Sequence, residues 1–175
     1  DSVKHDVKRL DRLITDISDA SRLDAELARH EQRAIDTVKL LAAIIHLANE
    51  TRKEDQAEIT FDAAKLPLGM DPMRGYVFLG HDSRIGQVVR NLLDNARSFT
   101  APGTRINVRV RRGANDSEFR VDDHGPGIRP DNLERVFERF YTDRPQNDFG
   151  SNSGLGLAIS KQIVEAHKGR IWAEN

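Results

Sequence analysis

The 175-residue sequence predicts an α/β fold, a two-layer α/β sandwich in which helices cover one face of a mixed sheet, preceded by a long N-terminal helix. Three observations predict it. Segments with apolar residues at helical spacing alternate with segments of strand periodicity. Two strictly alternating segments are joined by a short turn, as in a β-hairpin. A charged stretch with apolar residues at alternating spacings of four and three precedes them, which is typical of a helix that packs against another helix.

The composition limits the function classes. Hydrophobic residues make up 38% and charged residues 31% of the chain, which suits a soluble folded domain and argues against disorder. The formal net charge of -1 excludes a global positive field for nucleic acid or an anionic membrane. Cysteine is absent, so disulfides and thiolate metal sites are excluded. The longest strongly apolar run, residues 40–45, is far too short to span a membrane. We expect no nucleic-acid partner, and membrane attachment only through segments outside this chain.

The opening segment predicts one helix. Its seam lacks a partner helix within the segment, so this helix needs a partner elsewhere. We expect it to cover residues 1–29 and the globular domain to cover residues 30–175. Residues 28–33 are polar and predict a linker. The seam consists of Val3, Val7, Leu10, Ile14 and Ile17, widened by Leu13, Ala20 and Leu27.

The globular part predicts alternating helices and strands. Apolar residues at helical spacing mark the helices, and residues 66–75, with two prolines and two glycines, mark a loop. In chain order we expect a helix over 36–52, a strand over 57–62, a strand over 76–79, a helix over 84–99, strands over 105–111 and 118–123, a helix over 131–141, a mobile polar loop over 144–153, a helix over 155–167 and a final strand over 170–173.

Two carboxamides share one face of the helix predicted over 84–99. Asn91 and Asn95 are four residues apart, opposite the apolar stripe. Neutral oxygen ligands suit Mg²⁺ when phosphates and water fill the remaining octahedral positions. The alternative is a polar helix edge without a ligand.

A second motif, Asp123-His124-Gly125-Pro126-Gly127-Ile128, ends the strand over 118–123. Asp123 is in phase with Phe119 and Val121, so we expect it to point inward, where a carboxylate needs a partner. The exocyclic amine of adenine is one, and guanine has an acceptor there. Gly125 and Gly127 would let the backbone approach a flat ring. The alternative is a tight turn held by a capping aspartate.

The third motif, Gly154-Leu155-Gly156-Leu157, opens the helix over 155–167. A helix N-terminus presents free amides to phosphates. An isolated Gly-X-Gly is weak evidence for such a site and more often marks an ordinary helix start.

In this order the motifs resemble the Bergerat (GHKL) ATP fold shared by histidine kinases, Hsp90, MutL and type II topoisomerases. Residues 137–141, FERFY, resemble the phenylalanine box of histidine kinases. Residues 154–171, GLGLAISKQIVEAHKGRI, resemble their second glycine box and following helix. Residues 13–27, LITDISDASRLDAEL, resemble the second helix of a dimerisation and histidine-phosphotransfer hairpin, with particular similarity to the ChvG/ExoS/BvrS group of α-proteobacterial kinases.

The resemblance implies a protein-histidine kinase domain of a two-component sensor. Such a domain transfers the γ-phosphoryl of Mg-ATP to a histidine absent from this chain, for relay to a response regulator aspartate. ATP and Mg²⁺ are the implied cofactors. A cognate response regulator and a second copy, joined through the hairpin, are the implied partners, and the implied location is the cytoplasmic part of an inner-membrane receptor. Asn91 and Asn95 are the implied catalytic residues and metal ligands. The implied nucleotide contacts are Asn91, Asn95, Arg97, Ser98, Phe99, Asp123, Gly125, Gly127, Ile128, Arg139, Tyr141, Arg144, Gly154, Leu155, Gly156 and Leu157.

The sequence departs from the family pattern at several places. Ser98 and Phe99 replace the usual basic residue and tyrosine, and we expect Arg97 to take the phosphate-facing role. Lys168 stands where glycine is usual. No phosphoacceptor box occurs, and the pair His5-Asp6 lacks the proline that would follow one. We therefore expect no autophosphorylation of the chain alone. His124 is interpreted as a spacing residue in its loop.

Three other functions share the fold. The resemblance implies that an ATPase of the Hsp90 or MutL type carries a glutamate base at the position of Asn91, and an asparagine cannot accept a proton. A neutral imidazole already offers a lone pair, so a histidine kinase needs no strong base there. The second alternative is a non-catalytic ATP-binding scaffold, against which the complete motif set argues. The third is an anti-sigma type serine kinase, and the heptad helix favours the dimeric sensor kinase over it.

Overall fold

The computed structural model describes residues 2–141 and 154–175. The chain divides into two compact units, one of residues 31–127 and one of residues 1–30 together with 128–175. Each unit is described by itself. The predicted boundary near residue 30 coincides with the end of the first helix. The sequence did not predict that this helix belongs to the same unit as the C-terminal segment.

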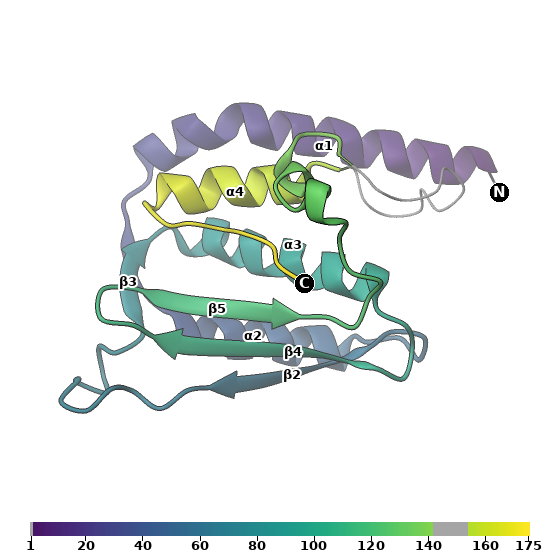
Figure 1. Ribbon diagram of the computed structural model, residues 1–175. Coiled ribbons are helices and arrows are strands. Elements are labelled where there is room, and N and C mark those ends of the chain that lie inside the picture. Colours follow the sequence, from purple (N-terminus) through teal and green to yellow (C-terminus); the bar gives the residue numbers. More distant parts are fainter. Residues whose placement is uncertain (1, 142–153) are drawn as a thin grey trace. The chain divides into compact units, whose positions relative to one another are not determined.

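The first unit contains a three-stranded mixed sheet. β2 (Glu58–Ala63) runs parallel to β4 (Arg105–Arg112), and β4 runs antiparallel to β5 (Ser117–Asp122) (Figure 1). The register sets Ile59 beside Ile106 and Asn107 opposite Asp122. The predicted mixed sheet and the hairpin of 105–123 are therefore confirmed, with boundaries within one residue.

A two-stranded ribbon completes this unit. β1 (Arg33–Asp36) pairs antiparallel with β3 (Val77–Gly80). The prediction of a linker that ends at Arg33 missed β1. Of its four residues only Ile35 is buried, so the strand shows too little alternation to be recognised in the sequence.

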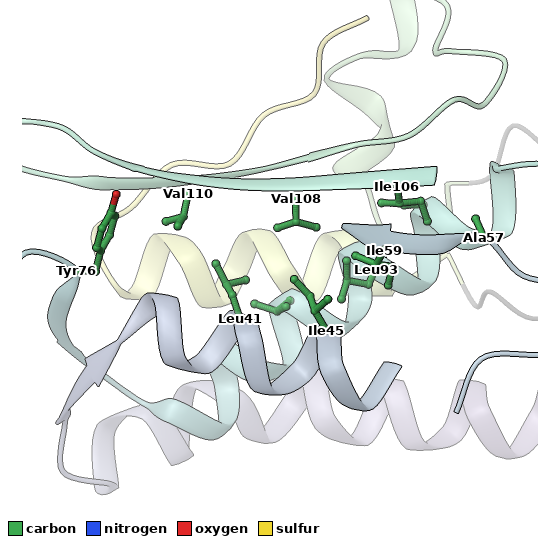
Figure 2. Close-up of a cluster of buried hydrophobic side chains, with 11 residues drawn as sticks. Leu41, Ile45, Ala57, Ile59, Tyr76, Leu93, Ile106, Val108 and Val110 are labelled. Carbon is green, nitrogen blue, oxygen red and sulfur yellow. The ribbon is translucent and has the colours of Figure 1, made fainter. Parts of the chain in front are cut away.

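α2 (Thr37–Glu50) and α3 (Asp82–Phe99) cover one face of the three-stranded sheet (Figure 2). Asp36 caps α2, because its side chain accepts a hydrogen bond from the backbone N–H of Lys39 at 3.1 Å. Ile106 is fully buried in this core, and truncating such a residue to alanine costs about 2–5 kcal/mol. The core residues are Leu41, Ile45, Ala57, Ile59, Tyr76, Val89, Leu93, Ala96, Ile106, Val108 and Val110.

Asn49, near the end of α2, closes the outer edge of the sheet. Its side-chain amide donates to the carbonyl oxygen of Ile59 at 2.8 Å, and its side-chain oxygen accepts from the backbone N–H of Ile59 at 3.0 Å. β2 is an edge strand, so these groups face away from β4. The carboxamide thus replaces the neighbouring strand that an edge lacks.

The second unit contains α1 (Ser2–Arg29), two 3₁₀ turns (Pro130–Asn132 and Arg135–Phe137) and α4 (Gly156–Ala166). α1 contacts α4, and the side chain of Gln162 donates to Asp24 at 2.9 Å. The first helix and the helix over 155–167 are confirmed. No helix of the described residues is long and apolar enough to cross a membrane.

Two predictions for this unit are wrong. A continuous helix over 131–141 is replaced by the two 3₁₀ turns, and Phe140, with φ of 62°, has left the helical region. The strand expected over 170–173 is absent, since the described residues after α4 form no strand ladder. Asn175 instead makes two hydrogen bonds to the backbone of Ile128, at 2.8 and 2.6 Å.

α1 presents two different apolar faces. Leu23 is fully buried, and Leu13, Ala20 and Leu27 are half-buried. The predicted seam is exposed: Val3 at 74%, Val7 at 51%, Leu10 at 57%, Ile14 at 62% and Ile17 at 50%. The seam therefore remains available to a partner helix.

Candidate functional site

The two asparagines lie on the same side of α3. Asn91 and Asn95 are both half-buried. Val89, Leu93 and Ala96 occupy the opposite side of the helix and pack into the core. This packing fixes the rotation of α3 about its axis, so the two carboxamides are held together on the face that does not enter the core.

Arg97 lies against α2. Its guanidinium Nη2 donates to the carbonyl oxygen of Ala48 at 2.9 Å. Burial lowers the pKa of Arg97, an effect that the nearby carboxylate of Asp94 partly offsets. The side chain of Arg97 therefore links α3 to α2. This geometry does not support the phosphate-facing role expected for Arg97.

The two residues after Arg97 end the helix. The hydroxyl of Ser98 donates to the carbonyl oxygen of Asn95 at 2.7 Å, which satisfies it within its own helix. Phe99 is 38% exposed. The N–H of Thr100 closes the last turn on the carbonyl of Ala96 at 3.0 Å. Of the three contacts predicted here, Phe99 is therefore the one whose side chain is exposed at the end of α3.

Asp123 follows β5 directly, as predicted, but the prediction that it points inward is wrong. β5 ends at Asp122, so the alternation that half-buries Phe119 and Val121 stops before Asp123, which is exposed. Its Oδ1 accepts a hydrogen bond from the backbone N–H of Gly125 at 2.7 Å. This is the capping-aspartate turn, in which Oδ1 forms the cap and the side chain as a whole is exposed.

The glycines of this turn have different roles. Gly127 has φ of 76°, which favours glycine. Gly125 lies against the end of α3: a Cβ there would be 3.0 Å from the Cβ and 3.2 Å from the carbonyl oxygen of Phe99. A side chain here would require its neighbours to shift by a few tenths of an ångström, so glycine favours this close approach of the turn to the helix. The structure thus brings the Asp123 turn to the end of the helix that carries Asn91 and Asn95.

The remaining predicted residues lie in the other unit. Gly154 has φ of 73°, Leu155 is buried, and Gly156 is the first residue of α4, with Leu157 in the same first turn. Among the described residues, no side-chain hydrogen bond caps the helix start. The positive end of the helix dipole favours an anion near this terminus.

Three predicted contacts precede α4. Arg139 is exposed, and the ring of Tyr141 is half-buried beneath the guanidinium of Arg135, whose Cζ lies 5.3 Å from the ring centroid. The backbone of Ile128 is bonded to Asn175. Arg144, and with it the loop predicted over 144–153, lies outside the described residues.

His124 makes a contact that sequence reasoning missed. Its Nδ1 lies 2.8 Å from the carbonyl oxygen of Arg105, the first residue of β4. The hairpin register could have predicted this contact. Its last pair is Asn107 and Asp122, and two more residues along each strand would place Arg105 opposite His124.

The chain is similar to a family of known proteins. Residues 80–175 match the family described as "Histidine kinase-, DNA gyrase B-, and HSP90-like ATPase". Sensor protein ChvG of Agrobacterium fabrum is 48% identical over 98% of the chain, and that of Rhizobium meliloti is 46% identical over all of it. The chain spans 29% and 30% of the length of these two relatives.

Solved structures of similar fold belong to histidine kinases. The mycobacterial sensor histidine kinase MprB is 31% identical with a TM-score of 0.63, covering 81% of this chain and 83% of that one. ShkA, solved in complex with AMPPNP, is 27% identical with a TM-score of 0.73, covering 92% of this chain and 32% of that one. More than half of the chain matches the family, including α3, the Asp123 turn and α4. The chain therefore belongs to the histidine kinase-, DNA gyrase B- and HSP90-like ATPase family.

Proposed function

We propose that this chain is the ATP-binding kinase segment of a two-component sensor, preceded by the second helix of its dimerisation hairpin. It transfers the γ-phosphoryl group of ATP to a histidine on a separate hairpin helix, for relay to an aspartate of a response regulator. Asn91 is the observation that carries this proposal, supported by the similarity of the whole chain to proteins named as sensors.

Asn91 separates the kinase from an ATPase. Hydrolysis needs a base that removes a proton from water, and a carboxamide cannot accept one. A histidine acceptor attacks with the lone pair of a neutral imidazole, so positioning and charge neutralisation are sufficient. A residue that is half-buried on the face of α3 opposite the core and cannot act as a base is therefore consistent with transfer to histidine.

Asp123 accounts for a choice of adenine over guanine. One of its carboxylate oxygens is occupied by the N–H of Gly125. The other can accept a hydrogen bond from the exocyclic amine of adenine. Guanine carries a carbonyl oxygen at that position, and two acceptors facing each other are rejected.

We assign phosphate contacts to the start of α4, where the helix dipole favours an anion, and to Arg139, which is exposed. The carboxamide oxygens of Asn91 and Asn95 fit Mg²⁺, since this ion accepts neutral oxygen ligands alongside phosphates and water. Bound there, Mg²⁺ supplies neutralisation of phosphate charge. The two asparagines then hold the triphosphate in a fixed position relative to the adenine bound at Asp123.

The partners follow from the same proposal. A second copy of the protein pairs through the exposed seam of α1, and a response regulator receives the phosphoryl group. In the longer protein, this segment lies on the cytoplasmic side of the inner membrane.

Transfer in trans tests the proposed function. The chain is incubated with γ-³²P-ATP, Mg²⁺ and a hairpin fragment that carries an acceptor histidine. We expect acid-labile label on the hairpin and none on the chain itself, with Asn91→Ala reducing transfer and Asn115→Ala, in the exposed β4–β5 turn, leaving it unchanged. Release of inorganic phosphate without labelled hairpin would favour the ATPase, and binding without either product would favour a scaffold.

A further inference from the structure

The turn that carries Asp123 is held at the end of the β4–β5 hairpin by a side chain. The hairpin register pairs Asn107 with Asp122, so two more residues of regular pairing would set Arg105 opposite His124. The backbone pairing of the hairpin stops at Asp122. Beyond it, the imidazole of His124 contacts the opposite strand instead of the backbone, with Nδ1 at 2.8 Å from the carbonyl oxygen of Arg105. The backbone of the turn therefore leaves the sheet after Asp122, where β5 ends.

The partner of Nδ1 determines the proton position on the ring. A backbone carbonyl oxygen only accepts hydrogen bonds, so Nδ1 must carry the hydrogen and donate it. The contact therefore requires a donor at the position of Nδ1. Asparagine can place its side-chain N–H at about this distance from its own backbone, whereas alanine has no donor.

The turn is then fixed on two sides. His124 contacts the start of β4, and Gly125 lies against Phe99 at the end of α3, where an added Cβ would be only 3.0 Å from the Cβ of Phe99. Asp123 directly precedes these two anchored residues in the chain, and its Oδ1 accepts a hydrogen bond from the N–H of Gly125. The direction of the carboxylate thus depends on where His124 anchors the backbone.

We propose that His124 is a positioning residue for the adenine-selecting carboxylate of Asp123. It acts through its Nδ1–H bond to the Arg105 carbonyl and makes no contact with the nucleotide itself. The proposal rests on the proposed function, in which Asp123 binds adenine. It replaces the interpretation of His124 as a spacing residue.

The test compares nucleotide selectivity in the full chain. Calorimetry with ADP and with GDP, both with Mg²⁺, is carried out on the wild type, His124→Ala and His124→Asn, with His46→Ala, an exposed histidine of α2, as the control. We expect His124→Ala to weaken ADP binding about five-fold, as loss of one hydrogen bond implies. The ratio of ADP to GDP affinity should fall with it, while His124→Asn and His46→Ala stay near the wild type. A purely structural role would weaken ADP and GDP equally.

A second measurement is independent of any nucleotide. The Gly125 amide donates to Asp123, so its hydrogen exchange in the free chain reports whether the turn is held. Exchange should accelerate in His124→Ala and return toward the wild type in His124→Asn. Unchanged Gly125 exchange in His124→Ala, or equal behaviour of the alanine and asparagine variants, overturns the proposal. A wild type that does not distinguish ADP from GDP overturns the role of Asp123 instead, and the exchange result then stands by itself.

Discussion

The backbone N–H of Phe140 donates a hydrogen bond to the carbonyl oxygen of Gly154 at 2.9 Å, and both residues have left-handed backbone conformations. Their φ angles are 62° and 73°. The contact joins the segment resembling a phenylalanine box to the start of α4. A Cβ on Gly154 would lie 2.9 Å from both the Cα and the carbonyl carbon of Phe140, so the junction has no space for a side chain.

Gly154→Ala should therefore disrupt this junction. The variant combines a left-handed alanine, which costs about 1–2 kcal/mol, with a backbone clash that no side chain can relieve. Gly69→Ala is the matched control, because Gly69 has φ of 83° with no atom within 4 Å of the added Cβ. We expect a larger loss of stability in urea unfolding at position 154 than at position 69, together with faster exchange of the Phe140 amide. Equal losses of stability in the two variants would mean that small local shifts relieve the backbone clash at position 154.

Asp123→Asn should weaken adenine nucleotide binding by about ten-fold or more, the range of a hydrogen bond to a charged group. The side chain keeps an oxygen for the Gly125 N–H but loses the negative charge and one of its two acceptors. Calorimetry with ATP and GTP measures the change, with Asp55→Asn, on the exposed α2–β2 loop, as the control. Equal affinity of the wild type for the two nucleotides would remove Asp123 from the site.

Asn95→Ala should nearly abolish binding of Mg²⁺-ATP, and Asn95→Asp should alter the metal dependence, because the oxygen ligand is removed or becomes charged. Asn91→Ala should reduce phosphoryl transfer more than binding. Titrations at several Mg²⁺ concentrations measure both effects. Asn115→Ala, which changes the same residue type on an exposed turn, should match the wild type. If binding by Asn95→Ala is as strong as by the wild type at every Mg²⁺ concentration, the metal is held elsewhere.

The seam of α1 should drive self-association. Leu10 and Ile14 are 57% and 62% exposed, so glutamate at either position should disfavour pairing of two seams without disturbing Leu23 on the other face. Sedimentation velocity measures the shift toward monomer, and Thr15→Glu, on an exposed position beside the seam, is the control. Deleting residues 1–28 is a poorer test, because α1 also contacts α4 through Asp24 and Gln162. An unchanged distribution of species would show that the seam does not mediate association.

Asn49→Ala should destabilise the first unit by about 2–3 kcal/mol. The substitution leaves the N–H and carbonyl of Ile59 without their side-chain partner at the sheet edge, and unsatisfied backbone groups cost about 1–3 kcal/mol each when buried. Urea unfolding measures the loss. Asn115→Ala should change the unfolding free energy by no more than about 0.5 kcal/mol, as expected for an exposed turn. A loss as small as that for Asn49→Ala would mean that water replaces the carboxamide.

Local patterns determined most of the fold. The apolar stripe of α3 and the strict alternation of β4 and β5 specify element type, because a buried face must recur at the period of its own backbone. β1 could not be predicted in this way, since a four-residue strand with one buried side chain carries almost no periodic signal. The residues after α4 were wrongly predicted as a strand, because a short apolar segment cannot show whether a neighbouring strand is available to pair with.

The candidate site likewise has features that the sequence determined and features that only the tertiary structure decided. By itself the sequence determined the order of its motifs and the shared face of Asn91 and Asn95, since both follow from spacing along one chain. The tertiary structure decided the direction of individual side chains. The guanidinium of Arg97 donates to the carbonyl oxygen of Ala48, and the carboxylate of Asp123 points outward and accepts from the N–H of Gly125. The imidazole of His124 contacts the carbonyl oxygen of Arg105. Each of these directions depends on a hydrogen-bonding group that packing places beside the residue, and in the cases of Arg97 and His124 that group is distant in the sequence.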